Sequence, residues 1–264
     1  MKILILGKTS SLSREFSKYL KKFNFFYKVE SLNKFLNLEL TKINKFDIII
    51  NFCIHRNYLN KSYDKKYDLD LKIIEKISKS KTIKFVMISS SKVYSSGSNL
   101  FETSKKKPTS IYGKNKLVTE KKIIKNFKNH LIFRLSNIIP GKFNKPKTSV
   151  TKTFFDIVRN NLKRKKIIFP RDNVYKDFIF VDDFCKLLLI SLKKKLIGVY
   201  NLSSGKKLYL KELALFLSKI TNYNIFYIDN KTDSFILNNN KLIKKLKYKG
   251  NIKKVNLINL IKIL

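Results

Sequence analysis

The chain is poor in the residues that form disulfide frameworks and zinc sites. It has two cysteines, Cys53 and Cys185, and both lie in apolar runs without a second cysteine or histidine at ligand spacing. Disulfide frameworks and zinc sites depend on such spacing. We therefore predict free thiols and no bound metal.

Long apolar runs are also missing. No stretch approaches the roughly 18 uninterrupted apolar residues of a membrane helix, and the apolar start, residues 1–7, is too short for the core of a signal peptide. We expect a soluble, cytoplasmic protein without a membrane partner. Its 264 residues fit one large domain, or a domain with a small appendage, and can bury a substantial core.

Acidic residues are scarce, since 18 Asp and Glu stand against 58 Lys and Arg, and the formal net charge is +40. A field of that sign attracts polyanions. The lysines are, however, spread along the whole chain instead of clustering in one segment, which argues against a nucleic-acid partner. A small substrate that carries phosphate would use the same positive field.

Short apolar runs alternate with segments of helical period along most of the chain. "KILIL" at residues 2–6 precedes a segment in which Leu12, Phe16 and Leu20 recur at helical spacing. The alternation continues, with strands expected at residues 46–54, 83–94, 130–137 and 177–181, and helices at 71–77, 116–127, 151–162 and 209–220. This order predicts an α/β fold with a Rossmann-like, doubly wound parallel sheet and helices on both of its faces.

Glycine is scarce where a dinucleotide-binding turn would need it. "GKTSSLS" follows the first expected strand and opens the first helix, where such folds hold a pyrophosphate on backbone N–H groups. Read as G-x-x-G-x-x-G, the segment keeps Gly7 but has Ser10 and Ser13 in place of the other two glycines. The position favours a cofactor turn, and a polar turn with an N-cap serine explains this segment alone equally well.

Two further segments carry groups suited to proton transfer. "ISSSKVY" places Ser90 at the end of an expected strand, and "IYGKNK" places Tyr112 and Lys116 four positions apart, on one face of a helix. A phenol has a pKa of about 10, so a nearby ammonium is needed to make Tyr112 a usable acid or base near neutral pH. The Tyr-Lys spacing alone is weak evidence in so lysine-rich a chain, and the serine strand end strengthens it.

With these motifs in this order, the sequence resembles the extended short-chain dehydrogenase/reductases, in their nucleotide-sugar epimerase, dehydratase and reductase branch. "FRLSNIIPG", "KDFIFVDD" and "GVYNLSSGKKLYLKELA" are similar to later motifs of that family, so the resemblance covers nearly the whole chain. It implies an NAD(P)-binding sheet domain at residues 1–140 and 172–202. A smaller, mostly C-terminal region at residues 141–171 and 203–264 would bind a nucleoside-diphosphate sugar.

The resemblance also implies roles for individual residues. Tyr112 would be the acid/base, Lys116 its electrostatic partner and a ligand of the nicotinamide ribose, and Ser90 the hydroxyl that orients the substrate. The cofactor, NAD or NADP, would contact Gly7, Thr9, Ser10, Leu12, Ser13, Glu30, Phe52, Cys53, Tyr112 and Lys116. The substrate would contact Ser91, Asn137 and Lys176, and Asp70 occupies the place of a family asparagine.

One departure from the family pattern concerns the adenosine half of the cofactor. Only about 15 residues separate the second strand, which ends near Glu30, from residue 46, so the family's third strand and its helix should be shortened or absent. Glu30 is placed to accept hydrogen bonds from a ribose hydroxyl, which favours NAD. Lys28 and the surrounding lysines would tolerate the 2'-phosphate of NADP, and the choice of cofactor stays open.

We expect an oxidoreductase that acts on a nucleotide-activated sugar, with 4-keto-sugar reduction as the preferred reaction. A nucleotide-sugar 4-epimerase is the alternative within this class, and a non-catalytic protein that binds nucleotide or NAD(P) is the alternative outside it. A 4,6-dehydratase is not expected, because Ser91 and Lys92 occupy the positions at which that branch carries two carboxylic acids. Pairing of the helices that flank the sheet would give a homodimer.

Overall fold

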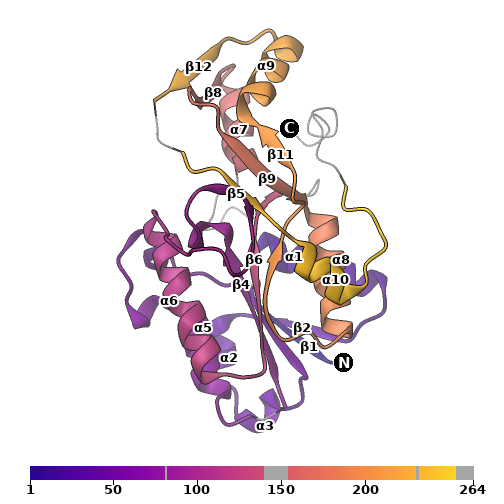
Figure 1. Cartoon of the computed structure of the whole chain (residues 1–264). Coiled ribbons are helices and arrows are strands. Elements are labelled where there is room, and N and C mark those ends of the chain that lie inside the picture. Colours follow the sequence, from indigo (N-terminus) through magenta and orange to yellow (C-terminus); the bar gives the residue numbers. More distant parts are fainter. Residues whose placement is uncertain (81, 140–153, 230–231, 254–264) are drawn as a thin grey trace.

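The computed structural model describes residues 1–80, 82–139, 154–229 and 232–253. Figure 1 shows a large sheet flanked by helices, with a smaller region of strands and helices beside one end of it. Residues 141–153, at the start of the expected substrate region, and residues 254–264 lie outside the described ranges. Among the helices of the described ranges, none is both long and apolar enough to cross a bilayer.

The large sheet consists of six parallel strands in the order β10-β6-β4-β3-β1-β2. Its strands are β1 (Ile3–Leu6), β2 (Tyr27–Glu30), β3 (Ile48–Asn51), β4 (Lys84–Ser90), β6 (His130–Leu135) and β10 (Gly198–Leu202). All residues of β1 and β3 are buried, because a parallel sheet covered on both faces requires nearly continuous apolar runs. The predicted doubly wound α/β fold is confirmed.

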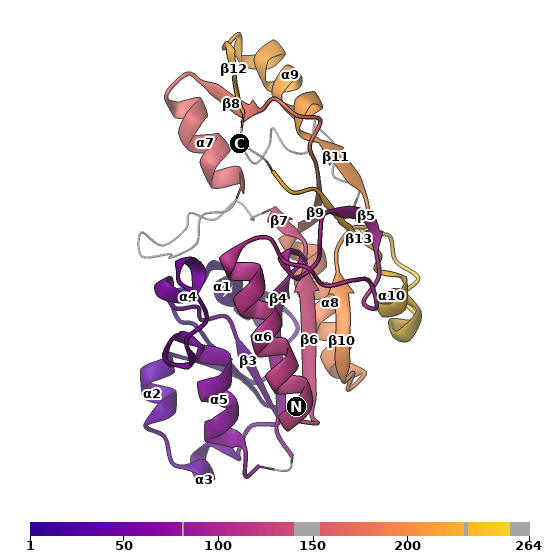
Figure 2. The same cartoon turned by 60° about the vertical axis from the view of Figure 1, so that its left-hand side comes forward.

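Helices cover both faces of this sheet (Figure 2). One face carries α1 (Ser11–Lys22), α8 (Val181–Lys193) and α10 (Asn240–Leu246), and the other carries α2 (Leu32–Leu36), α3 (Leu40–Ile43), α5 (Leu69–Ile77) and α6 (Ile111–Asn126). Ile3 and Ile5 of β1 belong to the core under α1 and α8, whereas Leu4 and Leu6 belong to the core under α5. Alternate side chains of one strand therefore stabilise two separate cores.

The segment between the second and third strands is short. Residues 31–47, all of them described, form α2 and α3 and no strand. In the described structure β2 pairs with β1 alone and forms an edge of the large sheet. The prediction that the family's third strand is shortened or absent is confirmed.

The smaller region combines a mixed sheet with a strand pair and two helices. Its sheet has the order β11-β9-β13-β5, formed by β5 (Gly97–Leu100), β9 (Tyr175–Phe180), β11 (Lys207–Tyr209) and β13 (Phe235–Leu237), and β7 (Asn137–Ile139) pairs with β9. Beside it, β8 (Ile167–Pro170), β12 (Ile225–Ile228), α7 (Phe154–Lys163) and α9 (Leu210–Thr221) enclose an apolar core. β5 and β9 join this sheet from within residues 1–140 and 172–202, and the domain boundaries stay a prediction.

Element boundaries around the expected catalytic residues differ from those predicted. The strand expected at 83–94 ends at Ser90, because the Ser90 Oγ accepts a hydrogen bond from the Lys92 N–H and starts the 3₁₀ turn η2 (Ser91–Val93). The strand expected at 46–54 spans Ile48–Asn51 only. The helix expected to carry Tyr112 and Lys116 on one face spans Ile111–Asn126, and the Ser110 Oγ caps it by accepting from the Gly113 N–H.

Candidate active site

The predicted cofactor turn at Gly7 lies between β1 and α1. Gly7 has φ +123°, which side chains disfavour, and a Cβ there would lie 3.2 Å from the backbone of Phe52. The other predicted residues of this segment surround the turn: Thr9 is exposed, Ser10 and Leu12 are half-buried, and Ser13 is buried. The first N–H groups of the 12-residue helix α1 follow directly and offer the donors and dipole that bind an anion.

The two serines that replace glycine are both suited to a bound phosphate. Within the described residues, the Ser10 side chain accepts no hydrogen bond from the first turn of α1, so its hydroxyl is available to a ligand. The Ser13 Oγ is buried and has no hydrogen-bond partner in the described part of the chain. Burying a hydroxyl that makes no hydrogen bond costs free energy. A ligand oxygen at this helix terminus would give the Ser13 hydroxyl a partner. The turn therefore fits the pyrophosphate of a dinucleotide.

Glu30 ends the strand next to this turn. The Gly7 N–H donates to the Glu30 carbonyl oxygen at 3.1 Å, and the Glu30 carboxylate lies 3.1 Å from the Lys28 Nζ and 3.4 Å from the Lys34 Nζ. Burial works to raise the pKa of Glu30, but the hydrogen bonds from these two ammonium groups outweigh burial and lower it. The carboxylate is thus charged at neutral pH and can accept a hydrogen bond from a ribose hydroxyl.

The serine turn η2 packs against the start of α6. A Cβ on Gly113 would lie 2.1 Å from the Lys92 carbonyl oxygen, so glycine is what allows the helix to approach the turn this closely. Ser90 ends β4 and caps this turn, Ser91 is the first residue of the turn, and Tyr112 directly precedes Gly113. Because the Ser90 Oγ accepts from the Lys92 N–H at 3.2 Å, its own O–H can still be donated to a ligand.

This contact predicts that Gly113→Ala is strongly destabilising. In an unobstructed helix the change would stabilise by about 1 kcal/mol, but here the methyl group meets backbone, and we expect a loss of about 1 to 3 kcal/mol or more. Urea unfolding followed by circular dichroism measures the difference. Gly97→Ala is the matched control, because its Cβ meets only the Leu100 side chain, at 3.2 Å. Equal stability of the two variants would contradict the close approach.

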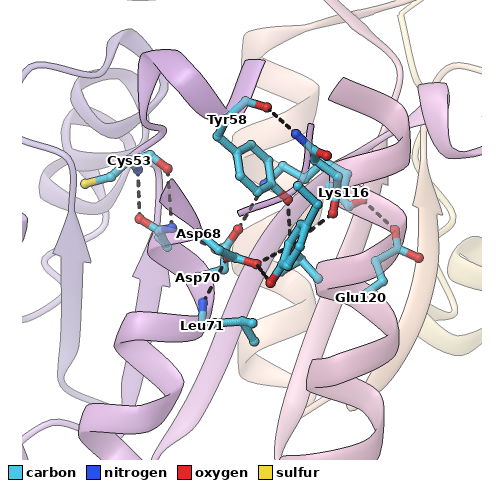
Figure 3. Close-up of polar contacts among 12 residues, drawn as sticks. Cys53, Tyr58, Asp68, Asp70, Leu71, Lys116 and Glu120 are labelled. Carbon is cyan, nitrogen blue, oxygen red and sulfur yellow. Dashed lines mark hydrogen bonds and ion pairs between the residues drawn. The ribbon is translucent and has the colours of Figure 1, made fainter. Parts of the chain in front are cut away.

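Lys116 is held by a buried carboxylate (Figure 3). Its Nζ lies 2.9 Å from the Asp70 Oδ2, and each of the two side chains is 5% exposed. Burial disfavours the charge on Lys116, but Asp70, with Tyr112 and Tyr58 nearby, outweighs burial and raises its pKa. Lys116 is therefore a cation at neutral pH, and its charge is paired.

Tyr112 is half-buried at the first turn of α6. Its ring meets that of Tyr58 edge to face, with the centroids 6.5 Å apart. Burial raises the pKa of Tyr112, Lys116 lowers it, and Asp70 raises it again, so that the net shift is upward. Lys116 acts on the pKa of Tyr112 in the predicted direction, but burial together with Asp70 outweighs it.

Several buried residues that support this site were not predicted. The Asn51 Nδ2 donates to the Asp70 Oδ1 at 2.7 Å. The hydroxyl of Tyr58, on α4 (Arg56–Asn60), lies 2.6 Å from the Thr119 Oγ1, which donates to the Asp68 Oδ2 at 2.6 Å. An amide that ends an otherwise apolar strand is the sequence signal that would have revealed Asn51. Tyr58 and Thr119 carry no such signal, because their partners are distant in the chain.

Cys53, predicted to line the cofactor, belongs to the same network. Its N–H donates to the Asn51 Oδ1 at 2.8 Å, and its carbonyl oxygen accepts from the Asn51 Nδ2 at 3.3 Å. Burial, with a contribution from Asp70, raises the pKa of the Cys53 thiol to about 12. Cys53 and Cys185 are both free cysteines, as predicted.

The predicted substrate residues Asn137 and Lys176 lie on the paired strands β7 and β9. The Asn137 Nδ2 donates to the Asp177 carbonyl oxygen at 3.0 Å, and the Lys176 Nζ donates to the carbonyl oxygen of Asp233. Burial, together with the charge of Lys92 on the serine turn, lowers the pKa of Lys176 to about 8. The smaller sheet thus brings a cation close to the turn that carries Ser90.

The chain belongs to the NAD dependent epimerase/dehydratase family, whose model matches residues 4–203. Comparison with curated proteins gives no match. Its fold is similar to that of solved nucleotide-sugar enzymes at low identity, which shows the fold alone. Three of them align with this chain over nearly their whole length.

The first is a dTDP-glucose 4,6-dehydratase from Bacillus anthracis in complex with NAD, with a TM-score of 0.80, 20% identity, and coverage of 100% of this chain and 95% of that chain. The second is a dTDP-4-dehydrorhamnose reductase from Clostridium acetobutylicum, with a TM-score of 0.77, 18% identity, and coverage of 100% and 98%. The third is a UDP-glucose 4-epimerase from Thermus thermophilus in complex with NAD, with a TM-score of 0.71, 15% identity, and coverage of 92% of both chains.

Proposed function

We propose that this protein is an NAD-dependent oxidoreductase that reduces a keto group on the sugar of a nucleoside-diphosphate sugar. The packing of the serine turn on the start of α6 is the observation that supports this proposal most. It brings Ser90, at the end of β4, near Tyr112, in the first turn of α6. Lys116 lies one helical turn further on. A protein that only bound nucleotide would not need this combination, which disfavours the non-catalytic alternative.

The dinucleotide would be held at the turn between β1 and α1. The N-terminal N–H groups of α1 suit its pyrophosphate, and the charged Glu30 suits a ribose hydroxyl better than a 2'-phosphate, which favours NAD over NADP. The solved dehydratase and epimerase both contain NAD. When bound in its reduced form, the nicotinamide supplies a hydride to the carbonyl carbon of the sugar.

The residues of the chain would orient the substrate and move the proton. The Ser90 hydroxyl donates a hydrogen bond to the carbonyl oxygen of the substrate and holds it toward Tyr112. Tyr112 then transfers its phenolic proton to that oxygen, which becomes the hydroxyl of the product. The resulting tyrosinate is stabilised by the Lys116 ammonium and recovers a proton from water.

The diphosphate of the substrate would meet the cation on β9. We expect Lys176→Ala to raise KM about tenfold or more, because hydrogen bonds to charged groups contribute roughly 1.5 to 3 kcal/mol. Lys211→Ala, which removes an exposed lysine of α9, serves as the control. Since the pKa of Lys176 is about 8, its charge is present below that pH, and KM should rise above it in the wild type but not in Lys176→Ala. Equal KM values for the two variants would contradict this role.

The serine turn argues against a 4,6-dehydratase. Elimination of water from the sugar needs one carboxyl group to protonate the leaving hydroxyl and another to take a ring proton, and Ser91 and Lys92 provide neither. Ser91 is buried and Lys92 is exposed on this turn. One phenol is sufficient for reduction, and also for 4-epimerisation, which is the second candidate.

Supplying 4-keto-6-deoxy nucleotide sugars with NADH or NADPH separates these reactions. Stoichiometric loss of the reduced-cofactor absorbance supports a reductase, and the faster of the two cofactors identifies the natural one. Inversion at C4 of a nucleotide hexose without net loss of reduced cofactor supports an epimerase. Formation of a 4-keto-6-deoxy product from an intact nucleotide hexose would contradict the proposal.

A further inference from the structure

Asp70 stands between two hydrogen-bond donors at the end of the large sheet. Its Oδ1 accepts from the Asn51 Nδ2 at 2.7 Å and its Oδ2 from the Lys116 Nζ at 2.9 Å. Asp70 is 4% exposed and lies in the first turn of α5, where the helix dipole favours a negative charge. In Figure 3 its carboxylate points toward Lys116.

The backbone of Cys53 determines which chemical group this position needs. The Cys53 N–H fixes the Asn51 Oδ1, and the Cys53 carbonyl oxygen fixes the Asn51 Nδ2, so the amide cannot turn its oxygen toward residue 70. Residue 70 therefore meets an N–H donor on one side and an ammonium on the other. A carboxylate accepts from both, whereas an asparagine has one acceptor oxygen and would place its own N–H₂ against a donor.

The other ionisable groups around Lys116 are engaged elsewhere or neutral. Asp68 accepts from the Leu71 N–H, the Tyr63 hydroxyl and the Thr119 hydroxyl. Tyr58 of α4 lies with its ring 5.6 Å from the Lys116 Nζ, and burial raises its pKa. The raised pKa of Cys53 keeps that thiol neutral as well. Asp70 is thus the charge that the Lys116 ammonium meets directly.

We propose that Asp70 is a positioning residue that pairs with Lys116 and, together with burial, favours the protonated form of Tyr112, which sets the site to donate a proton and therefore to reduce a keto sugar. This inference rests on the proposed function for the identity of the reaction. It goes further in assigning the direction of proton transfer to a residue that touches neither substrate nor cofactor. An unpaired Lys116 would favour tyrosinate, the form that takes a proton from a sugar hydroxyl.

The electrostatics of Tyr112 agree with this geometry. Burial raises the pKa of Tyr112, Lys116 opposes the increase, and Asp70 adds to it. In reduction, bound reduced nicotinamide would supply one hydride, which carries both electrons, to the carbonyl carbon, the C=O bond would become C–O, and the Tyr112 proton would complete the hydroxyl. A phenol that is protonated at the start supplies that proton directly. An epimerase must first remove a proton and so needs the opposite form.

The test is a titration of Tyr112 in the protein without cofactor. Tyrosinate absorbance is recorded against pH for the wild type and for Asp70→Asn, each minus the same protein carrying Tyr112→Phe, so that the other tyrosines cancel. We expect Tyr112 to ionise at least about one pH unit lower in Asp70→Asn. Asp68→Asn is the matched control, since it neutralises a neighbouring buried carboxylate that is bonded elsewhere, and should leave the titration unchanged.

The pH profile of turnover gives the second readout. In Asp70→Asn the alkaline limb of the reduction rate should move to lower pH by the same interval. The rate of product oxidation at neutral pH should rise about tenfold for each pH unit of that shift. If Asp70→Asn does not fold, Asp70→Ser, a smaller neutral side chain, takes its place. If Tyr112 ionises in Asp70→Asn at the same pH as in the wild type, or at a higher one, the inference is wrong. Absence of turnover in the wild type, with the titration shifted as expected, overturns the proposed function alone.

Discussion

Replacing Tyr112 by phenylalanine should lower turnover by about 100-fold to 10,000-fold, the usual contribution of a general acid. The change removes the transferable proton and leaves the ring, which can still meet Tyr58 edge to face. The free energy of unfolding and the affinity for the dinucleotide should therefore stay close to those of the wild type. Steady-state rates with a 4-keto nucleotide sugar, together with calorimetric titration of NADH, measure the two properties separately.

The control for this variant is Tyr19→Phe, which removes a hydroxyl from a half-buried tyrosine of α1. It should retain the wild-type rate. If Tyr112→Phe kept more than half of that rate, Tyr112 would not be the proton donor. If it lost most of its dinucleotide affinity as well, the Tyr112 hydroxyl would contribute to cofactor binding to a degree that we do not expect.

Replacing Lys116 by methionine should have two separate effects. The first is loss of turnover together with weaker dinucleotide binding, because the ammonium is proposed both to stabilise the tyrosinate and to contact the ribose. The second is a loss of about 3 to 5 kcal/mol of stability, because Asp70 would remain buried without its cation. Denaturant unfolding and calorimetric titration of NADH distinguish the two effects.

A second substitution separates the structural effect from the catalytic one. Asp70→Asn in the Lys116→Met background removes the unpaired carboxylate, so we expect it to recover most of the lost stability and none of the turnover. Lys114→Met, an exposed lysine on the same helix, should change neither property. The ion pair would have no structural role if Lys116→Met were as stable as the wild type.

The sequence predicted the features of this site that depend on neighbours in the chain. The apolar runs of β1 and β3 identify buried parallel strands, and the short interval after Glu30 predicts the missing third strand. The strand end at Ser90 and the helix face of Tyr112 and Lys116 can each be read locally, and the structure has both. The roles of these three residues stay a prediction. The same local reading placed Gly7 at a turn that the structure shows to need glycine.

The features that were missed depend on partners that are distant in the chain. Asp70 and Lys116 form a buried pair through the packing of α5 against α6, and no local pattern indicates that these two side chains meet. The upward shift of the Tyr112 pKa follows from that pair and from burial, so it was not predicted either. β5 and β13 are short strands that pair with each other in the smaller sheet although they are far apart in the chain, so their own sequences do not predict the pairing.

The pairing of β5 with β13 has a consequence for synthesis on the ribosome. The Gly97 N–H donates to the Ser234 carbonyl oxygen, and the Asn238 N–H donates to the Leu100 carbonyl oxygen. β5 therefore emerges long before its partner exists, whereas β1, β2, β3 and β4 can pair with one another once residue 90 has emerged from the ribosome. A nascent chain would thus assemble the dinucleotide turn early and complete the sheet that carries Lys176 only at the end of translation.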